Sequence, residues 1–482
     1  MSNYYKIPAF AIVGHPNEGK SSVVSTLAEN DRVRISAIPG ETIVCETYPV
    51  IIDGHEIIRF IDTPGFQNPK TILKWLKRHE SLSDQAIPAF IDKHINNPDM
   101  AQDCELLNPI AHGAGIIYVV DGSRPLRSVD EAEMEILRLS GAPRMAIINL
   151  KEEETRYLSQ WKTAFRLHFN SIRNFNAHQA TYTERISLLE SLKGIDQDWI
   201  DPLSTVLSSF KKDWAYRSVR TTEVILKMLT ESLEYSISKN FNEKVFEEEL
   251  KNKLFDKYIR SIEKIETSAH QQIRKLYKHN IFNYDLPEHS IIHQDLFSEK
   301  TWQVLGLSQK QLTTLAAITG GTIGAAIDLA TAGISFGIFT AIGGAIGAGW
   351  AALGGGRQLA GSKVGGIKLG GQQVQVGPNE NIQFLYILID RSLIFYSHII
   401  NWAHGRRDIS EINKEVSLLP DKTGYTATWN IKDQRKCIAF FKAVRNGDPI
   451  KKEKAYKELA ETIQSELTKI YSIEGSGKEG IP

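Results

Sequence analysis

Cysteine is scarce in this chain, and the few cysteines lie far apart. Cys45, Cys104 and Cys437 are the three among 482 residues, and their spacing matches no zinc-binding pattern. Secreted domains that are held by disulfides are short and rich in cysteine, so this composition argues against that class. We therefore expect a protein of the reducing cytosol.

The chain also lacks an excess of one charge and an apolar leader. Its 57 basic and 57 acidic side chains give a formal net charge of +0, so no overall field favours nucleic acid, and no nucleic-acid partner is expected. Residues 1–6 are polar, and the first apolar run resembles a core strand, so no secretion signal is expected. Both absences predict a cytoplasmic protein.

The most informative motif lies between a strand-like run and a helix-like run near the N-terminus. Residues 9–13 are apolar, residues 14–21 read G-H-P-N-E-G-K-S, and the helix-like run 22–27 follows at once. This context matches the phosphate-binding P-loop, in which backbone N–H groups and a helix N-terminus meet the phosphates. Lys20 is expected to reach the outer phosphates, and the Ser21 hydroxyl is expected to bind Mg²⁺. The sequence predicts a nucleotide-binding protein.

A β-hairpin is expected directly after this region. The runs 43–52 and 56–61 are rich in strand-forming residues, and Asp53-Gly54 between them is a strong hairpin turn signal. Pairing outward from the turn brings Thr42 and Asp62 to the same end of the two strands. A hydroxyl and a carboxylate beside the P-loop are what Mg²⁺ on a nucleoside triphosphate requires.

These motifs together resemble a known family. The motif Asp62-Thr63-Pro64-Gly65 follows the second strand, where the N–H of Gly65 can sense a γ-phosphate. With G-x-x-N-x-G-K-S and a threonine about twenty residues further on, the N-terminal region resembles the Era-like branch of the translation-factor class of P-loop GTPases. The whole chain is similar to a bacterial family in which such a domain precedes a large C-terminal domain of unknown function. Residues 108–113, residues 118–125 and a later glycine-rich segment carry this wider similarity.

The resemblance implies a set of site residues in this sequence. GTP or GDP is the implied ligand, with Mg²⁺ as cofactor. Lys20, Thr42 and Gly65 are expected to act in catalysis, and Ser21, Thr42 and Asp62 are expected to bind Mg²⁺. The residues expected to contact the nucleotide are Gly14, Asn17, Glu18, Gly19, Lys20, Ser21, Ser22, Asn149 and Glu152.

The guanine-reading motif departs from the family pattern N-K-x-D. The apolar strand 144–148 is followed by Asn149-Leu150-Lys151-Glu152, so leucine replaces the lysine that covers the base and glutamate replaces the aspartate. Glu152 still offers a carboxylate, on a side chain that is one methylene longer; an ordinary charged loop is the alternative interpretation. Residues 176–178 stand where the last base-contacting loop is expected. The resemblance favours GTP over ATP.

The hydrolysis motif departs as well. Phe66 stands where some GTPases carry a glutamine that orients the attacking water. GTPases with such an apolar substitution resemble this chain in having an asparagine in the P-loop, here Asn17, which in relatives helps to hold K⁺. A potassium-assisted reaction, or one completed in a homodimer, is one hypothesis. A loop residue that bonds its own backbone is the other interpretation of Asn17.

The length predicts about three domains. The first is an α/β P-loop GTPase domain with a mixed, mostly parallel sheet. It includes a helical insert at 67–107 that follows Asp62-Thr63-Pro64-Gly65, which we call the switch motif. The rest is expected to be mainly α-helical, with a Gly/Ala-rich hairpin. The predicted divisions are 1–190 for the GTPase domain, 191–310 for a helical domain, 311–474 for the hairpin and a C-terminal α+β region, and 475–482 for a disordered tail.

The Gly/Ala-rich hairpin allows two interpretations. Residues 312–356 contain one charged residue, Asp328, and pairs of glycines four apart, a spacing that lets helices approach closely in lipid. Glycine weakens helix propensity, however, and a carboxylate is costly in the bilayer centre. The hairpin either associates with or enters the inner membrane, or it packs in a soluble core. Beyond it, residues 363–377 are expected to form a small β element and residues 384–404 a helix.

The sequence thus predicts a GTP-binding and GTP-hydrolysing switch with slow turnover. Its effector domain is helical, and in one interpretation it engages membrane lipid or a membrane protein. The alternative is a nucleotide-gated membrane-inserting or scaffolding protein with little or no turnover.

Overall fold

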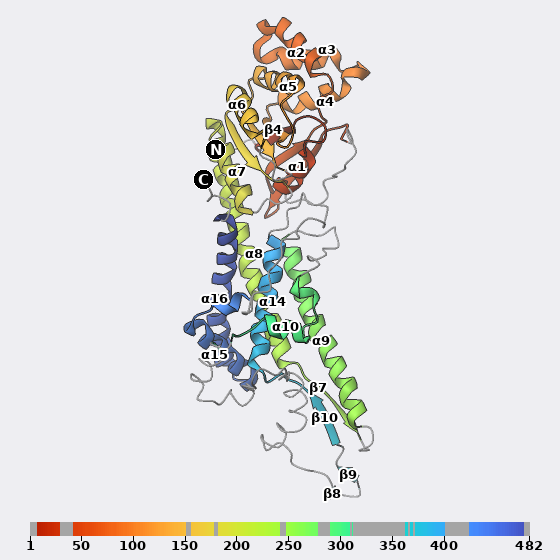
Figure 1. The fold of residues 1–482 in the computed structure, drawn as a ribbon, viewed down its shortest axis with the longest axis vertical. Coiled ribbons are helices and arrows are strands. Elements are labelled where there is room, and N and C mark those ends of the chain that lie inside the picture. Colours follow the sequence, from red (N-terminus) through yellow and green to blue (C-terminus); the bar gives the residue numbers. More distant parts are fainter. Residues whose placement is uncertain are drawn as a thin grey trace.

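The computed structural model has an α/β domain at one end and a long helical bundle that extends from it (Figure 1). The two parts meet along the helix that links them. The residues that the structure describes are 7–28, 42–150, 156–177, 182–241, 247–277, 290–308, 311, 362–364, 367–369, 372–400 and 424–476.

A six-stranded sheet forms the centre of the α/β domain, in the order β2-β3-β1-β4-β5-β6. Only the pair β2–β3 is antiparallel, and the other four pairs are parallel. The mixed, mostly parallel sheet predicted from the sequence is confirmed. The strands are β1 (Ala9–Val13), β2 (Glu46–Ile52), β3 (His55–Asp62), β4 (Gly115–Asp121), β5 (Arg144–Asn149) and β6 (Ser171–Phe175).

The predicted hairpin turn has the backbone conformation that its sequence favours. Asp53 and Gly54 have φ values of 52° and 78°, and both positive values match the twist of a two-residue hairpin. The ladder then places Glu46 opposite Asp62, after a bulge near Val50. Thr42 precedes this ladder, at the same end of the hairpin as Asp62.

Helices cover both faces of the sheet. One apolar core lies under α1 (Lys20–Ala28), α7 (Tyr182–Lys193) and the first half of α8 (Ile200–Glu234). A second core on the other face lies under α5 (Ser128–Leu139), α6 (Leu158–His168) and the helical insert. The nearly continuous apolar strands β4 and β5 are buried between these layers, as expected for parallel strands.

The insert after the switch motif is helical, as the sequence predicts. Ile72 and Leu76 on its first helix are buried and Trp75 is half-buried, which gives that helix one face toward the domain. The insert consists of α2 (Pro69–Arg78), η1 (Glu80–Gln85), α3 (Ala86–His94), η2 (Pro98–Met100) and α4 (Ala101–Ala111).

One long helix belongs to both parts of the molecule. Helix α8 spans Ile200–Glu234, and its 35 residues extend roughly 50 Å. Its first half contributes Leu203 and Phe210 to the core that also contains Phe10 of β1. Its second half contributes Ile225 and Leu229 to the core of the bundle.

The bundle has a single core built from both sides of residue 310. Helices α8, α9, α14, α15 and α16 all contribute to it, so the two predicted C-terminal regions pack together. The predicted β element is present, but its third strand pairs with β7, which the sequence reasoning missed. The remaining elements are η3 (Gln197–Trp199), β7 (Ile237–Phe241), α9 (Glu247–Leu276), η5 (Ile291–His293), α10 (Glu299–Val304), β8 (Ser362–Val364), β9 (Ile367–Leu369), β10 (Gln372–Val376), α14 (Ile382–Ile400), η6 (Tyr425–Thr428), α15 (Ile431–Asn446) and α16 (Pro449–Ser476).

The Gly/Ala-rich hairpin at 312–356 lies outside the described residues. In the described part of the chain, every helix is too short or too polar to cross a bilayer. Helix α16 continues to Ser476, two residues into the predicted tail, and residues 477–482 lie outside the described part.

Candidate nucleotide-binding site

The P-loop follows β1 and leads into α1, as its motif requires. Gly14 has a φ of 147°, and a side chain there would run into the carbonyl oxygen of Val119 on β4. Gly19 has a φ of 93°, and Asn17 is one of two non-glycine residues with positive φ in the described part, at 67°. The loop therefore turns tightly against the sheet, and α1 begins at Lys20. Ser22, two residues after Lys20, is buried in this helix.

The ammonium group of Lys20 lies against the P-loop itself. Its Nζ donates to the carbonyl oxygens of Gly14 at 3.2 Å and His15 at 3.0 Å. Burial lowers the pKa of Lys20, and the carboxylates of Asp62, Glu133 and Glu18 oppose this effect. A buried ammonium of this kind is a strong binding group for a phosphate.

Ser21 and Asp62, two of the residues expected to bind Mg²⁺, lie together. The Ser21 hydroxyl donates to Oδ2 of Asp62 at 2.6 Å. Oδ1 of Asp62 is buried and has no hydrogen-bond partner among the described residues. Burial raises the pKa of Asp62 to about 6, against the hydrogen bond from Ser21 and the charge of Lys20. A hydroxyl beside a carboxylate oxygen without a partner is a donor set that fits Mg²⁺.

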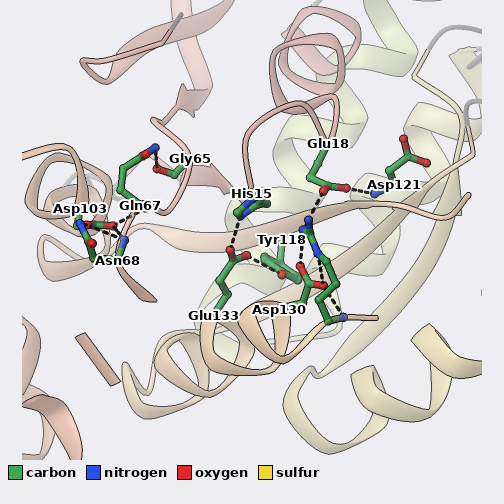
Figure 2. Close-up of polar contacts among 12 residues, drawn as sticks. His15, Glu18, Gly65, Gln67, Asn68, Asp103, Tyr118, Asp121, Asp130 and Glu133 are labelled. Carbon is green, nitrogen blue, oxygen red and sulfur yellow. Dashed lines mark hydrogen bonds and ion pairs between the residues drawn. The ribbon is translucent and has the colours of Figure 1, made fainter. Parts of the chain in front are cut away.

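The switch motif packs directly on the P-loop. A side chain at Gly65 would place its Cβ 2.5 Å from the Pro16 ring, so the two loops meet at van der Waals distance. Phe66 is 1% exposed and belongs to the core, which leaves no polar side chain at the position next to Gly65. Gln67 follows, and its Nε2 donates to the Gly65 carbonyl at 2.9 Å (Figure 2).

A buried carboxylate on α4 holds the segment after the switch motif. Asp103 accepts from the backbone N–H of Gln67 at 2.9 Å and of Asn68 at 3.1 Å (Figure 2). Burial raises the pKa of Asp103, and these hydrogen bonds oppose the rise. Sequence reasoning missed Asp103. An aspartate on the apolar side of a predicted helix was the signal that could have identified it.

A second network of hydrogen bonds and ion pairs occupies the side chain of Glu18, so this carboxylate does not face a phosphate. Its carboxylate accepts from the Asp121 N–H and pairs with Arg124, which also binds Asp130 at 2.8 Å (Figure 2). Burial raises the pKa of Glu18, and Arg124 opposes the rise. Any phosphate contact from Glu18 therefore falls to its backbone N–H.

A buried carboxylate on α5 supports the first turn of the P-loop. Glu133 accepts from the Tyr118 hydroxyl at 2.8 Å and lies 2.9 Å from Nδ1 of His15 (Figure 2). Burial and the neighbouring carboxylates raise the pKa of Tyr118 well above its ordinary value, so the phenol remains a donor. Sequence reasoning missed this triad, because its three members are distant in the chain.

Asn149 connects the P-loop to the loop after β6. Its Nδ2 donates to the Glu18 carbonyl at 3.1 Å, and its Oδ1 accepts from the Ala177 N–H at 3.2 Å. The Ala177 carbonyl in turn accepts from Thr26 of α1. These bonds give Asn149 a positioning role between the two loops. Glu152 and residue 178 lie outside the described residues.

Comparison with known proteins finds GTPases that are similar to the N-terminal region. A model of the family "50S ribosome-binding GTPase" matches residues 9–150. Over 121 residues the chain is 36% identical to "GTPase Der" of Agathobacter rectalis, covering 24% of this chain and 27% of that protein. Over 136 residues it is 32% identical to "GTPase Era" of Ureaplasma parvum, covering 26% and 43%. The matched segments therefore span less than half of these relatives.

Two further matches have lower identity. The chain is 24% identical over 214 residues to "tRNA modification GTPase MnmE" of Staphylococcus epidermidis, covering 42% of this chain and 45% of that protein. A crystal structure of Era in complex with MgGDPNP and nucleotides 1506-1542 of 16S ribosomal RNA aligns with a TM-score of 0.28 at 16% identity. That alignment covers 58% of this chain and 92% of the Era chain.

The N-terminal region is thus an Era-like P-loop GTPase domain, as the sequence resemblance implies. A second family model, described as a domain of unknown function (DUF3482), matches residues 162–468. That range is well over half of the chain, and the protein therefore belongs to the DUF3482 family, with an Era-like GTPase domain at its N-terminus.

Proposed function

We propose that the N-terminal domain binds GTP with Mg²⁺, hydrolyses it to GDP and phosphate, and acts as a switch for the helical region. The observation that carries this proposal is the Ser21–Asp62 pair beside the buried ammonium of Lys20. A hydroxyl, a carboxylate oxygen without a partner and a cation at one P-loop fit a nucleotide and its metal ion. Relatives named as GTPases support guanine as the base.

In this proposal, catalysis comes from positioning and charge stabilisation. Lys20 exchanges its two backbone carbonyl partners for the outer phosphates, while the N–H groups of the loop contact the remaining oxygens. Ser21, Thr42 and Asp62 hold Mg²⁺, which neutralises charge on the phosphate oxygens when it is bound. The N–H of Gly65, in contact with the P-loop, reports the γ-phosphate to the insert.

Guanine selectivity is assigned to the segment after β5. Asn149 fixes the distance between the P-loop and the loop after β6, and Glu152 supplies the carboxylate for the guanine N–H groups. The longer side chain of Glu152 is the reason to expect weaker discrimination than an aspartate gives.

Two further roles belong to the hydrolysis step. Phe66 cannot hydrogen-bond water, so a K⁺ ion held with the help of Asn17 is proposed to supply positive charge at the phosphates. The backbone of the P-loop has a positive φ at Asn17. Completion of the site by a second copy of the chain is the alternative source of that charge.

The helical bundle is the proposed effector region. Helix α8 runs from the sheet into the bundle core, which gives a rigid route between the two. We propose that the Gly/Ala-rich segment 312–356 brings this region to membrane lipid or a membrane protein. The competing proposal is a nucleotide-gated scaffold in which turnover is slow or absent.

Nucleotide binding and turnover of the full chain test the main proposal. Binding of fluorescent GDP and release of phosphate from GTP are measured with Mg²⁺, alongside ATP as competitor. Lys20→Ala is expected to abolish triphosphate binding while the protein stays folded, and Lys162→Ala on α6 serves as the control. Unchanged GTP affinity in Lys20→Ala would overturn the P-loop assignment.

A second measurement separates the two forms of the proposal. Multiple turnover of GTP supports a hydrolysing switch, whereas binding without turnover supports the gated scaffold. Sedimentation with liposomes, in GDP and in a non-hydrolysable GTP analogue, tests the membrane role. A chain that stays in the supernatant in both nucleotide states contradicts it.

A further inference from the structure

A groove of about 690 Å³ lies between α2 and α5 on the outer side of the GTPase domain. These helices lie toward the end of the domain that is away from the bundle (Figure 1). Leu73 and Ala132 contribute apolar surface to the groove, and Ser128 lies on the α5 wall. The nucleotide site described above uses none of these residues.

The α2 wall of the groove is strongly basic. Lys70, Lys74, Lys77 and Arg78 are all exposed and line the groove, and their spacing puts them on one face of the helix. Within the described part of the chain, none of the four forms an ion pair. Apart from the charge interaction of Lys77 with Glu135, this basic face is available to an acidic ligand.

The α5 wall carries carboxylates, but one of them is already neutralised. Glu135 accepts from Arg138 at 2.7 and 2.8 Å and lies 3.6 Å from Nε2 of His168. The hydrogen bond from Arg138 lowers the pKa of Glu135. The four cationic side chains of α2 therefore outnumber the two carboxylates of the groove, Glu131 and Glu135.

We propose that this groove docks an acidic, amphipathic helical segment of a partner protein. The partly exposed side chain of Leu73 can contact the apolar side of such a helix, while carboxylates at helical spacing pair with the lysines of α2. Nucleic acid fits less well, because none of the described lining residues is Phe, Tyr or Trp, on which bases stack.

Both walls of the groove are tied to loops of the nucleotide site. Helix α2 begins at Pro69, directly after the segment that Asp103 holds. Helix α5 carries Glu133, which contacts His15 of the P-loop. A partner that binds between the two helices is therefore connected to both the switch motif and the P-loop. Docking itself does not depend on the proposed GTPase function.

The test uses the full chain without nucleotide and a fluorescein-labelled 16-residue helical peptide of leucine and glutamate. Fluorescence anisotropy at low salt measures its affinity. The triple variant Lys70→Glu, Lys74→Glu, Lys77→Glu is expected to weaken binding at least about tenfold, since three attractive contacts become repulsive. Replacement of the same three lysines by glutamine is expected to give an intermediate loss.

The matched control reverses three lysines on another helix. Lys451, Lys454 and Lys457 on α16 are also exposed, and their change to glutamate alters the net charge equally. The control is expected to keep wild-type affinity. Circular dichroism and GDP binding of each variant confirm that it is folded.

Three outcomes would overturn the proposal. The first is that the peptide does not bind the wild-type chain. The second is an equal loss of affinity in the groove variant and the α16 control, which would indicate a general charge effect. The third is that a 16-nucleotide oligouridylate displaces the peptide and binds more tightly to the wild type than to the groove variant. That result would assign the groove to nucleic acid.

Discussion

The buried carboxylate of Asp62 lowers the stability of the nucleotide-free protein at neutral pH, although the proposed Mg²⁺ site needs its charge. Burial raises its pKa from 3.8 to about 6. Because the folded-state pKa lies above the unfolded value, the folded protein holds the proton more tightly and loses stability as the pH rises through this interval. A shift of about two pKa units corresponds to about 3 kcal/mol at pH 7.5.

The substitution Asp62→Asn removes this charge and keeps an oxygen that can accept from Ser21. In chelator and without nucleotide, we expect the variant to be more stable than the wild type at pH 7.5, by up to about 3 kcal/mol. The difference should shrink toward zero only below about pH 3, where the wild-type carboxyl is protonated in both states. Denaturant unfolding of the full chain across this pH range measures the difference directly.

The same substitution should cost function. An amide is a poorer Mg²⁺ ligand than a carboxylate, so Mg²⁺ should no longer strengthen GTP binding or raise the unfolding temperature of the GTP-bound chain. Asp92→Asn, at an exposed position on α3, makes the same chemical change away from the site and should have neither effect. An Asp62→Asn variant that is less stable at pH 7.5, or that keeps the full Mg²⁺ effect, would refute the reasoning.

Three other predictions concern single residues. Gly65→Ala introduces a Cβ 2.5 Å from the P-loop, so calorimetry should show about tenfold weaker binding of a GTP analogue and nearly unchanged binding of GDP. Equal weakening of both nucleotides would contradict a γ-phosphate role. Asn17→Ala should remove any excess of GTP turnover in K⁺ over Na⁺ at matched ionic strength, and identical wild-type rates in both salts would leave Asn17 as a loop residue. Glu266→Gln breaks the buried ion pair with Arg391 and should destabilise the bundle by about 3 to 5 kcal/mol in denaturant unfolding. The control Glu223→Gln, at an exposed pair, should cost under about 1 kcal/mol, and an equally small loss for Glu266→Gln would show that its pair is not buried in solution.

The parts of the site that the sequence predicted are those encoded by short-range chemistry. The P-loop needs glycine where φ is positive, and the hairpin turn needs Asp53-Gly54, so both can be recognised from adjacent residues. Asp62 then lies near Ser21 because β3 pairs in parallel with β1, where Asp62 is opposite Ile12 just before the P-loop. Only the bulge near Val50, which shifts the register, was not foreseeable from the pattern.

The supporting carboxylates could not be predicted in this way. Asp103 and Glu133 come from helices whose periodicity predicts a buried face but does not say which loop that face meets. Similarly, β7 pairs with β10 across more than a hundred residues of chain, and no local pattern specifies that partner. Tertiary packing decides these contacts, and a single sequence carries no direct record of it.

The position of the DUF3482 region within the fold has a consequence for its function. The matched range begins at residue 162, inside α6, so it includes β6 at the edge of the central sheet as well as α7. Phe175 and Leu189 from this range share a core with Phe10 and Val24 of the GTPase domain. The family region therefore cannot bury its first strand and helices without the rest of the sheet.

Helix α8 extends this dependence into the bundle. Its residues pack first on the core beside β1 and then, without interruption, on the core around α14. A single helix can transmit a shift between two packed cores only as a rigid element, because its backbone hydrogen bonds resist bending. Any displacement of α1 or α7 that accompanies nucleotide exchange must therefore be absorbed where α8 meets the sheet or be passed to the bundle. The edge-to-face contact of Trp199 with Phe10, at a centroid distance of 4.7 Å, fixes the start of α8 to β1 and favours transmission.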